Sequence, residues 1–111
     1  MMTLIEKYVK AMQEKDYTAL AELFAKDGTI MDHCPNGANQ LEYHVYGKEA
    51  IGMFYRNKFT FGKHSISEAE ILSESQAKFV ASYNGFLVMA IANIRRTTED
   101  GLIERLSVRP K

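Results

Sequence analysis

Gly28-Thr29-Ile30-Met31-Asp32-His33-Cys34 is a run that predicts a β-strand with a carboxylate near its centre. Asp is depleted in strands, so its presence here needs a reason. An inward-pointing Asp32 has to be paired or hydrated, because a lone buried charge is costly. Alternation places Ile30, Asp32 and Cys34 on one face and Met31 on the other. Since apolar residues occupy both faces, the pattern leaves open whether Asp32 lies inside or is exposed.

Two helices are expected before this strand. Residues 3–15 carry apolar side chains at helical spacing, Tyr8 among them, and Thr3 with Glu6 fits a capping box. A second helix is expected over residues 17–26, with Asp16 as its N-cap and Gly28 as the residue that ends it.

The rest of the chain predicts one more helix and a series of strands. Pro35–Asn39 has the composition of a turn, residues 41–46 predict a short strand, and residues 48–60 predict the third helix. Strands are then expected at 65–73, 77–84, 86–94 and 102–109, with Asn84-Gly85 as a hairpin turn. Residues 1–111 therefore predict a single α+β domain, in which a cone-shaped, curved antiparallel sheet wraps around three helices.

The strand at 86–94 is apolar on both faces. Leu87, Met89, Ile91 and Asn93 share one face, and Phe86, Val88, Ala90, Ala92 and Ile94 share the other. Sheets with one solvated face alternate apolar and polar residues, so this pattern indicates that both faces are covered. Helices can cover one face only, and we expect a homodimer through the outer face. The alternative is a strand that is merely rich in apolar residues.

Composition excludes several classes of partner. Fourteen basic and fourteen acidic side chains cancel, so neither nucleic acid nor an anionic membrane is an expected partner. No apolar run approaches the ~20 residues that cross a bilayer. The single cysteine, Cys34, excludes an internal disulfide, and a cytoplasmic protein is expected.

The chain resembles the nuclear-transport-factor-2-like superfamily, in particular the branch of ketosteroid isomerases and SnoaL-like polyketide cyclases. The resemblance covers essentially the whole chain and is specific for the fold rather than for an activity. It rests on these segments: Tyr8-Val9-Lys10-Ala11-Met12, Asp16, Leu20 to Asp32, Gly47-Lys48-Glu49-Ala50-Ile51 and Phe54-Tyr55.

The resemblance implies roles for individual residues. Asp32 matches the aspartate general base of ketosteroid isomerases, and Tyr8 matches the tyrosine that hydrogen-bonds the substrate carbonyl. The second oxyanion donor of that family, a protonated aspartate on a late strand, falls on Asn93, or on Ala92 if the last turn differs by one residue. An amide can still donate a hydrogen bond to an oxyanion. The segment 35–46 changes one rim of the cavity and argues against a steroid substrate.

Two hypotheses of function follow. The first is an isomerase, cyclase or dehydratase that acts on a small apolar carbonyl compound with no metal and no organic cofactor. The second is a non-catalytic module of the same fold that binds a small ligand or a partner protein. We expect Phe54, Tyr55, Met89, Tyr46 and His44 to contact the ligand, with His44 or His64 as a further acid–base group at the cavity mouth. The histidines are too scattered for a zinc motif.

Overall fold

The computed structural model describes residues 1–34 and 42–111, so the turn expected at Pro35–Asn39 lies outside the described residues. In the part that is described, three helices and six strands follow one another. Their bounds are α1 Leu4–Glu14, α2 Tyr17–Glu22, β1 Phe24–Asp32, β2 Tyr43–Tyr46, α3 Lys48–Thr60, β3 Ser65–Ile71, β4 Gln76–Tyr83, β5 Phe86–Thr97 and β6 Ile103–Pro110.

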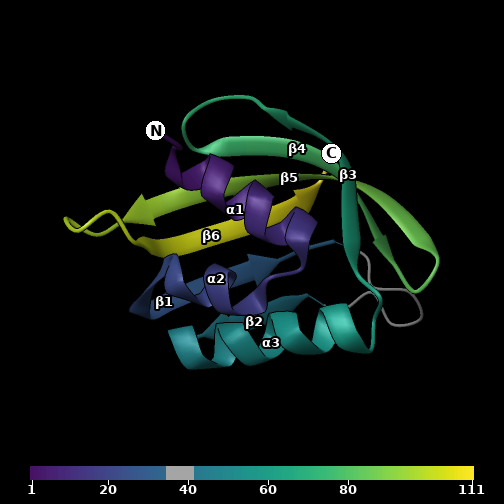
Figure 1. Ribbon diagram of the computed structural model, residues 1–111, viewed down its shortest axis with the longest axis horizontal. Helices are drawn as coiled ribbons and strands as arrows, with labels where there is room; N and C mark the ends of the chain where they lie inside the picture. Colours follow the sequence, from purple (N-terminus) through teal and green to yellow (C-terminus); the bar gives the residue numbers. More distant parts are fainter. Residues whose placement is uncertain (35–41) are drawn as a thin grey trace.

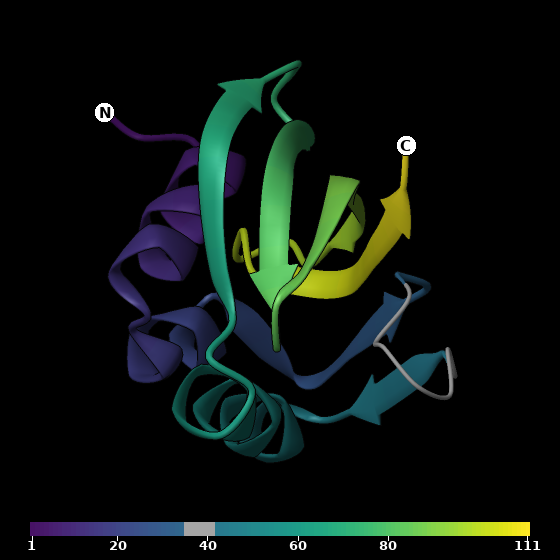
Figure 2. The ribbon, with the colours of Figure 1, turned by 90° about the vertical axis from the view of Figure 1, so that its right-hand side faces the viewer.

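The described strands form one sheet in the order β2-β1-β6-β5-β4-β3. The sheet is strongly curved and is not closed, because β2 and β3 remain as its two edges (Figure 2). α1 packs against β3 and β4, whereas α3 packs against β1 and β2, and α2 lies between the two longer helices (Figure 1). The predicted α+β fold with a curved sheet around three helices is confirmed.

The sheet contains one pairing that the sequence pattern did not reveal. β3, β4, β5 and β6 form the expected antiparallel meander, but β6 then pairs in parallel with β1. The last strand therefore lies in the middle of the sheet, between β5 and β1.

Local sequence signals explain most helix and turn boundaries. The capping box predicted for α1 is present, because the side chains of Thr3 and Glu6 each accept a hydrogen bond from the other's backbone N–H. The carboxylate of Asp16 caps α2 by accepting from the N–H of Ala19 at 3.0 Å. Asn84 and Gly85 both have positive φ, as a two-residue hairpin turn between β4 and β5 requires.

The second helix is shorter than predicted. α2 ends at Glu22, and β1 begins at Phe24 rather than at Gly28. Gly28 therefore lies inside a strand, where the pairing of β1 with β6 is irregular between Phe24 and Thr29. A Cβ at Gly28 would lie 2.9 Å from the carbonyl oxygen of Ile103, so glycine permits a close backbone approach rather than ending a helix.

The core lies between the helices and the inner face of the sheet. The largest fully buried side chains come from α1, α2, β1, α3, β4 and β6: Tyr8, Ile5, Leu20, Phe24, Ile30, Ile51, Phe79, Ile103 and Leu106. Burial of a side chain of this size contributes about 1.5–3 kcal/mol. This packing fixes the sites at which α1, α3 and β1 present polar groups to the interior.

Candidate functional site

Asp32 lies in the interior at the end of β1. Ile30 and Asp32 are 1% and 7% exposed on the inner face, whereas Met31 between them is half-buried. Asp32 Oδ1 accepts a hydrogen bond from the backbone N–H of Cys34 at 3.0 Å. Its Oδ2 accepts one from the ammonium group of Lys58 at 3.1 Å. The carboxylate is therefore inside and is paired.

Lys58, in the last turn of α3, is the charge partner of Asp32. The two side chains are 12% and 9% exposed, and lysine is seldom buried this deeply unless it is paired. Its Nζ also lies 5.7 Å, 5.0 Å and 5.3 Å from the ring centroids of Tyr43, Phe54 and Tyr83. Aromatic faces attract a cation at such distances, so both the carboxylate and the rings hold the ammonium group in place.

Lys58 is not among the predicted site residues, although the sequence contains a signal for it. Lys58 follows Phe54 by four residues and Tyr55 by three, and residues at these spacings share one face of a helix. A lysine on the apolar face of α3 could therefore have been recognised as an inward charge that needs an acidic partner.

Tyr8 of α1 and Tyr55 of α3 meet inside the same region. Their hydroxyl oxygens lie 3.4 Å apart, and the residues are 0% and 3% exposed. Burial raises the pKa of the Tyr8 hydroxyl well above its ordinary value, and the negative charge of Asp32 acts in the same direction. Burial also raises the pKa of Tyr55 strongly. Both hydroxyls therefore keep their protons and remain available as hydrogen-bond donors.

His64 adds a neutral imidazole to this interior. It is 5% exposed, it lies beside the rings of Phe59 and Tyr83, and its Nδ1 has no hydrogen-bond partner among the described residues. Burial lowers the pKa of His64 to about 3, and the positive charges of Lys58 and Lys15 add to the effect. His64 is therefore buried in the interior, not placed at the cavity mouth as the sequence suggested.

We expect His64→Gln to make the protein less sensitive to mild acid. Because the pKa of His64 is about 3 in the folded chain, against an ordinary value of 6.5, the unfolded chain binds the additional proton between these pH values. The free energy of unfolding therefore falls with decreasing pH, by up to about 1.4 kcal/mol per pH unit from this group. Urea unfolding near neutral pH and near pH 5 measures the difference. His44→Gln, at an exposed histidine, should leave the full acid loss in place; equal acid loss in both variants would contradict the assignment.

Cys34 lines the cavity beside Asp32 but is a poor nucleophile. Burial raises the pKa of the Cys34 thiol to about 12, and the negative charge of Asp32 acts in the same direction. A thiol of this kind stays protonated near neutral pH, and the thiolate is the reactive form.

These side chains enclose a small cavity between α1, α3 and the inner face of the sheet. Its volume is about 30 Å³, and its polar lining includes Asp32, Lys58, Tyr8, Tyr55 and His64. A buried water needs about 10–15 Å³, whereas pockets for drug-sized ligands span about 300–1,000 Å³. The cavity therefore accommodates a few waters or the polar head of a ligand.

An open groove lies directly outside this cavity. It has a volume of about 380 Å³ and contains Phe54 and Phe61 on its wall. Tyr43, Lys58 and Tyr83 line both the groove and the interior cavity. These three side chains therefore form the boundary between solvent and the interior.

The structure corrects the placement of Asn93. Ala90 and Ala92 are fully buried on the inner face of β5, and the half-buried Asn93 between Ala92 and Ile94 belongs to the outer face. Ala92 takes the inward position, so β5 supplies no second oxyanion donor to the cavity. Both faces of β5 are apolar, and the burial of Ala90 and Ala92 identifies the inner one.

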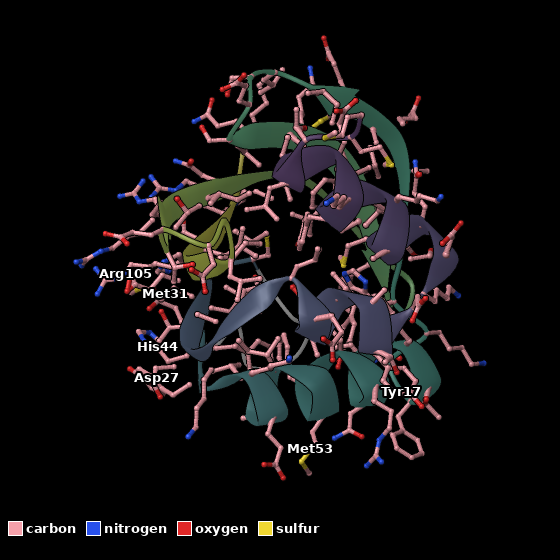
Figure 3. All side chains as sticks on the ribbon, turned by 60° about the vertical axis from the view of Figure 1, so that its left-hand side comes forward. Tyr17, Asp27, Met31, His44, Met53 and Arg105 are labelled. Atoms are coloured by element: carbon pink, nitrogen blue, oxygen red, sulfur yellow. The ribbon has the colours of Figure 1, made fainter. Side chains whose placement is uncertain are left out.

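The predicted ligand-contacting residues are only partly brought together. Tyr55 lines the cavity and Phe54 lines the groove, where their rings pack at 5.2 Å. Tyr46 and Met89 are instead 69% and 44% exposed. His44 is exposed beside Met31 at the margin of the molecule and bonds to Glu42 (Figure 3). Alternation along β2 and β5 turns these three side chains away from the core.

Two further observations concern metals and membranes. Within residues 1–34 and 42–111, no three His, Cys, Asp or Glu side chains are grouped so as to hold a metal ion. In the same ranges, no helix has both the length and the apolar character that crossing a bilayer requires.

A curved, open sheet that holds helices along its inner face defines an α+β roll, and solved structures of this shape are numerous. No family model matches the sequence, and no curated protein matches it either. One similar structure is that of a presumed ketosteroid isomerase from Kribbella flavida DSM 17836. The two sequences are 15% identical, the match covers 97% of this chain and 75% of that chain, and the TM-score is 0.69. A computationally designed 17-OHP binder is 22% identical to this chain. The match covers 97% of this chain and 88% of the binder, with a TM-score of 0.67.

A presumed polyketide cyclase from Sinorhizobium meliloti is also similar, with 23% identity, coverage of 96% and 93%, and a TM-score of 0.64. These likenesses extend over nearly the whole chain. The protein therefore has the nuclear-transport-factor-2-like, cystatin-like fold that its sequence resembles. Identities this low establish the fold and leave the activity to the chemistry of the site.

Proposed function

We propose that this protein is an enzyme that moves a proton next to the carbonyl group of a small, largely apolar compound. Asp32 acts as the general base, and Tyr8 donates a hydrogen bond to the developing enolate oxygen. The reaction class is isomerisation, intramolecular aldol cyclisation or dehydration. The observation that carries the proposal is that Asp32 and Tyr8 line one interior cavity.

The second oxyanion donor is assigned to Tyr55 in place of Asn93. The Tyr55 hydroxyl lies 3.4 Å from that of Tyr8, and the raised pKa of each keeps both protonated. Paired hydroxyls can turn their protons toward a new charge, which is the function of an oxyanion hole.

The size of the cavity limits what the ligand can be. The space of about 30 Å³ accepts a carbonyl head group, and the remainder of the ligand lies in the groove of about 380 Å³. The names of proteins with this fold include an isomerase, a cyclase and a designed ligand binder, so a binding or catalytic role toward a small ligand fits the fold.

We expect Tyr8→Phe to slow the exchange of α-protons of a carbonyl probe into deuterated water, measured by proton NMR with phenylacetaldehyde. Loss of one oxyanion donor typically costs about 10²–10³-fold in rate, and Tyr55 should limit the loss to the lower end of that range. Tyr17→Phe, at a tyrosine that is 40% exposed, is the matched control and should exchange at the wild-type rate. Absence of exchange above the buffer rate in the wild-type protein would exclude the proposed reaction.

A specific observation favours the alternative of a non-catalytic binding module. Asp32 is already satisfied by Lys58 and by the backbone of Cys34, so its carboxylate has partners without any substrate. A binding module should shift the resonances of cavity residues when the probe is added, yet leave the α-proton exchange at the buffer rate.

We also propose that two copies of this chain associate through the outer face of the sheet. Leu87 and Met89 are 72% and 44% exposed there, next to the partly buried Val80 and Ile91 on the paired strands. Exposed apolar side chains gathered on one face are typical of an interface, and a two-fold axis lets one patch cover itself.

Leu87→Glu is expected to abolish this association, because a charge within the patch is desolvated in the dimer. Sedimentation velocity should show a dimer for the wild-type chain and a monomer for the variant. Met53→Glu is the control, since Met53 is 50% exposed on α3 and points away from the sheet (Figure 3). A wild-type monomer at all concentrations would contradict the proposal.

Cytoplasm as the location of the protein stays a prediction. The single Cys34 carries a protonated thiol, since burial raises its pKa to about 12, and free thiols are typical of reducing compartments. Cell fractionation tests this location, and recovery of the protein outside the cytoplasmic fraction would contradict it.

A further inference from the structure

Lys58 differs from the other ion-paired lysines in how deeply its partner is buried. The side chains of the glutamates that pair with Lys48 and Lys78 are 67% and 60% exposed, whereas the side chain of Asp32 is 9% exposed. The side chain of Lys58 is itself only 12% exposed. This lysine therefore has an acid–base partner in an environment that contains little water.

Lys58 is also within reach of a ligand. It lines both the interior cavity and the outer groove, so it lies where the two meet. The aromatic rings of Tyr43, Phe54 and Tyr83 surround its Nζ at 5.0–5.7 Å. A flat apolar group can lie against these rings while its polar end points toward Asp32.

We propose that the amino group of Lys58 captures a small aldehyde or ketone as an imine. This inference rests on the proposed function, because it takes the same class of carbonyl ligand at the same cavity. Buried lysines beside apolar groups are a recurrent means of forming such covalent intermediates.

The reaction balances within the residues present. The Lys58 ammonium group transfers a proton to the Asp32 carboxylate, and the neutral amine attacks the carbonyl carbon. The C–O π electrons move to oxygen, which takes a proton from the nitrogen to give a carbinolamine. Asp32 then returns its proton to the hydroxyl, which leaves as water while the nitrogen lone pair forms the C=N bond. The products are an iminium ion, one water and the Asp32 carboxylate, with no oxidation or reduction.

The iminium ion would assist removal of the α-proton, with nitrogen instead of the carbonyl oxygen taking up the electron pair. A positively charged nitrogen draws electrons from the adjacent carbon more strongly than a neutral carbonyl does, so the α-proton becomes more acidic. Asp32, restored to its carboxylate form beside that nitrogen, can then remove the proton.

Reductive trapping tests the inference directly. The wild-type protein is incubated with phenylacetaldehyde and sodium cyanoborohydride, which reduces an iminium ion to a stable secondary amine, and peptides are mapped by mass spectrometry. We expect Lys58 to be labelled at least about tenfold faster than Lys48, and to saturate with aldehyde concentration as a binding site does.

Lys48 is the internal control because it lies on the same helix and pairs with Glu22 at 3.2 Å, close to the 3.1 Å of the pair at Lys58. Lys58→Arg keeps the positive charge for Asp32 but cannot form the imine, so the site-specific label should disappear in a folded protein. Labelling of Lys58 no faster than that of Lys48, or without saturation, would overturn the inference.

The α-proton exchange assay, run in parallel, separates this inference from the proposed function. A trapped adduct without exchange supports imine formation and contradicts Asp32 as the productive base. Exchange in the wild-type protein without any trapped adduct at Lys58 supports the base and overturns the imine.

Discussion

Asp32→Asn lowers the rate of α-proton exchange by about 10²–10⁴-fold, if the carboxylate is the general base, because an amide cannot accept the proton. The substitution preserves shape, and the amide oxygen can still accept the hydrogen bond from the N–H of Cys34. The loss should therefore appear in turnover and not in ligand binding. NMR exchange rates and probe titrations on the same samples provide both quantities.

The necessary control concerns folding, because Asp32→Asn leaves the charge of Lys58 unpaired. Circular dichroism of the single variant, and of Asp32→Asn with Lys58→Met, establishes whether each is folded at the assay temperature. Asp27→Asn, at an exposed carboxylate on the same strand, should retain full activity. Exchange at the wild-type rate in folded Asp32→Asn would exclude this residue as the base.

The largest effect on stability is expected at the same ion pair. Lys58→Met removes one partner and leaves a carboxylate that is 9% exposed without its counter-charge. Breaking a buried pair in this way typically lowers the free energy of unfolding by about 3–5 kcal/mol. Replacing both partners, by Asp32→Leu with Lys58→Met, should recover most of this loss, since no uncompensated charge remains.

Urea unfolding of the two single variants and the double variant measures this cycle. Lys48→Met provides the comparison, because Lys48 and Glu22 form an exposed pair worth at most about 1 kcal/mol. Additive losses in the double variant would show that the two charges do not stabilise each other.

The sequence predicted correctly the features that depend on neighbouring residues, and it did not predict those that depend on distant strand partners. The capping box at Thr3 and Glu6 and the turn at Asn84-Gly85 depend on neighbouring residues, and both are present. The start of β1 at Phe24 depends on Ile103 of β6, a partner almost eighty positions away. The helical spacing of apolar residues from Leu20 to Phe24 predicted a continuing helix instead of this strand. The parallel pairing of β1 with β6 was hidden for the same reason.

Candidate site residues could be predicted where a polar side chain is unusual for the strand or helix face on which it lies. A carboxylate in a strand identified Asp32, and a tyrosine on an apolar helix face identified Tyr8. Asn93 was assigned to the cavity from the family resemblance, by its spacing from the last turn. Alternation could not decide between Asn93 and Ala92, because β5 is apolar on both faces. Lys58 was missed because a charge at the end of a helix usually lies in solvent.

The central position of β6 has a consequence for synthesis of the chain. β1 and β2 form one part of the sheet and β3, β4 and β5 form another, and β6 alone joins them. A ribosome releases the N-terminal residues first, so both parts wait with an unpaired edge until residues 103–110 emerge. We therefore expect the nascent protein to need protection at two strand edges until β6 is translated, when both edges are closed together.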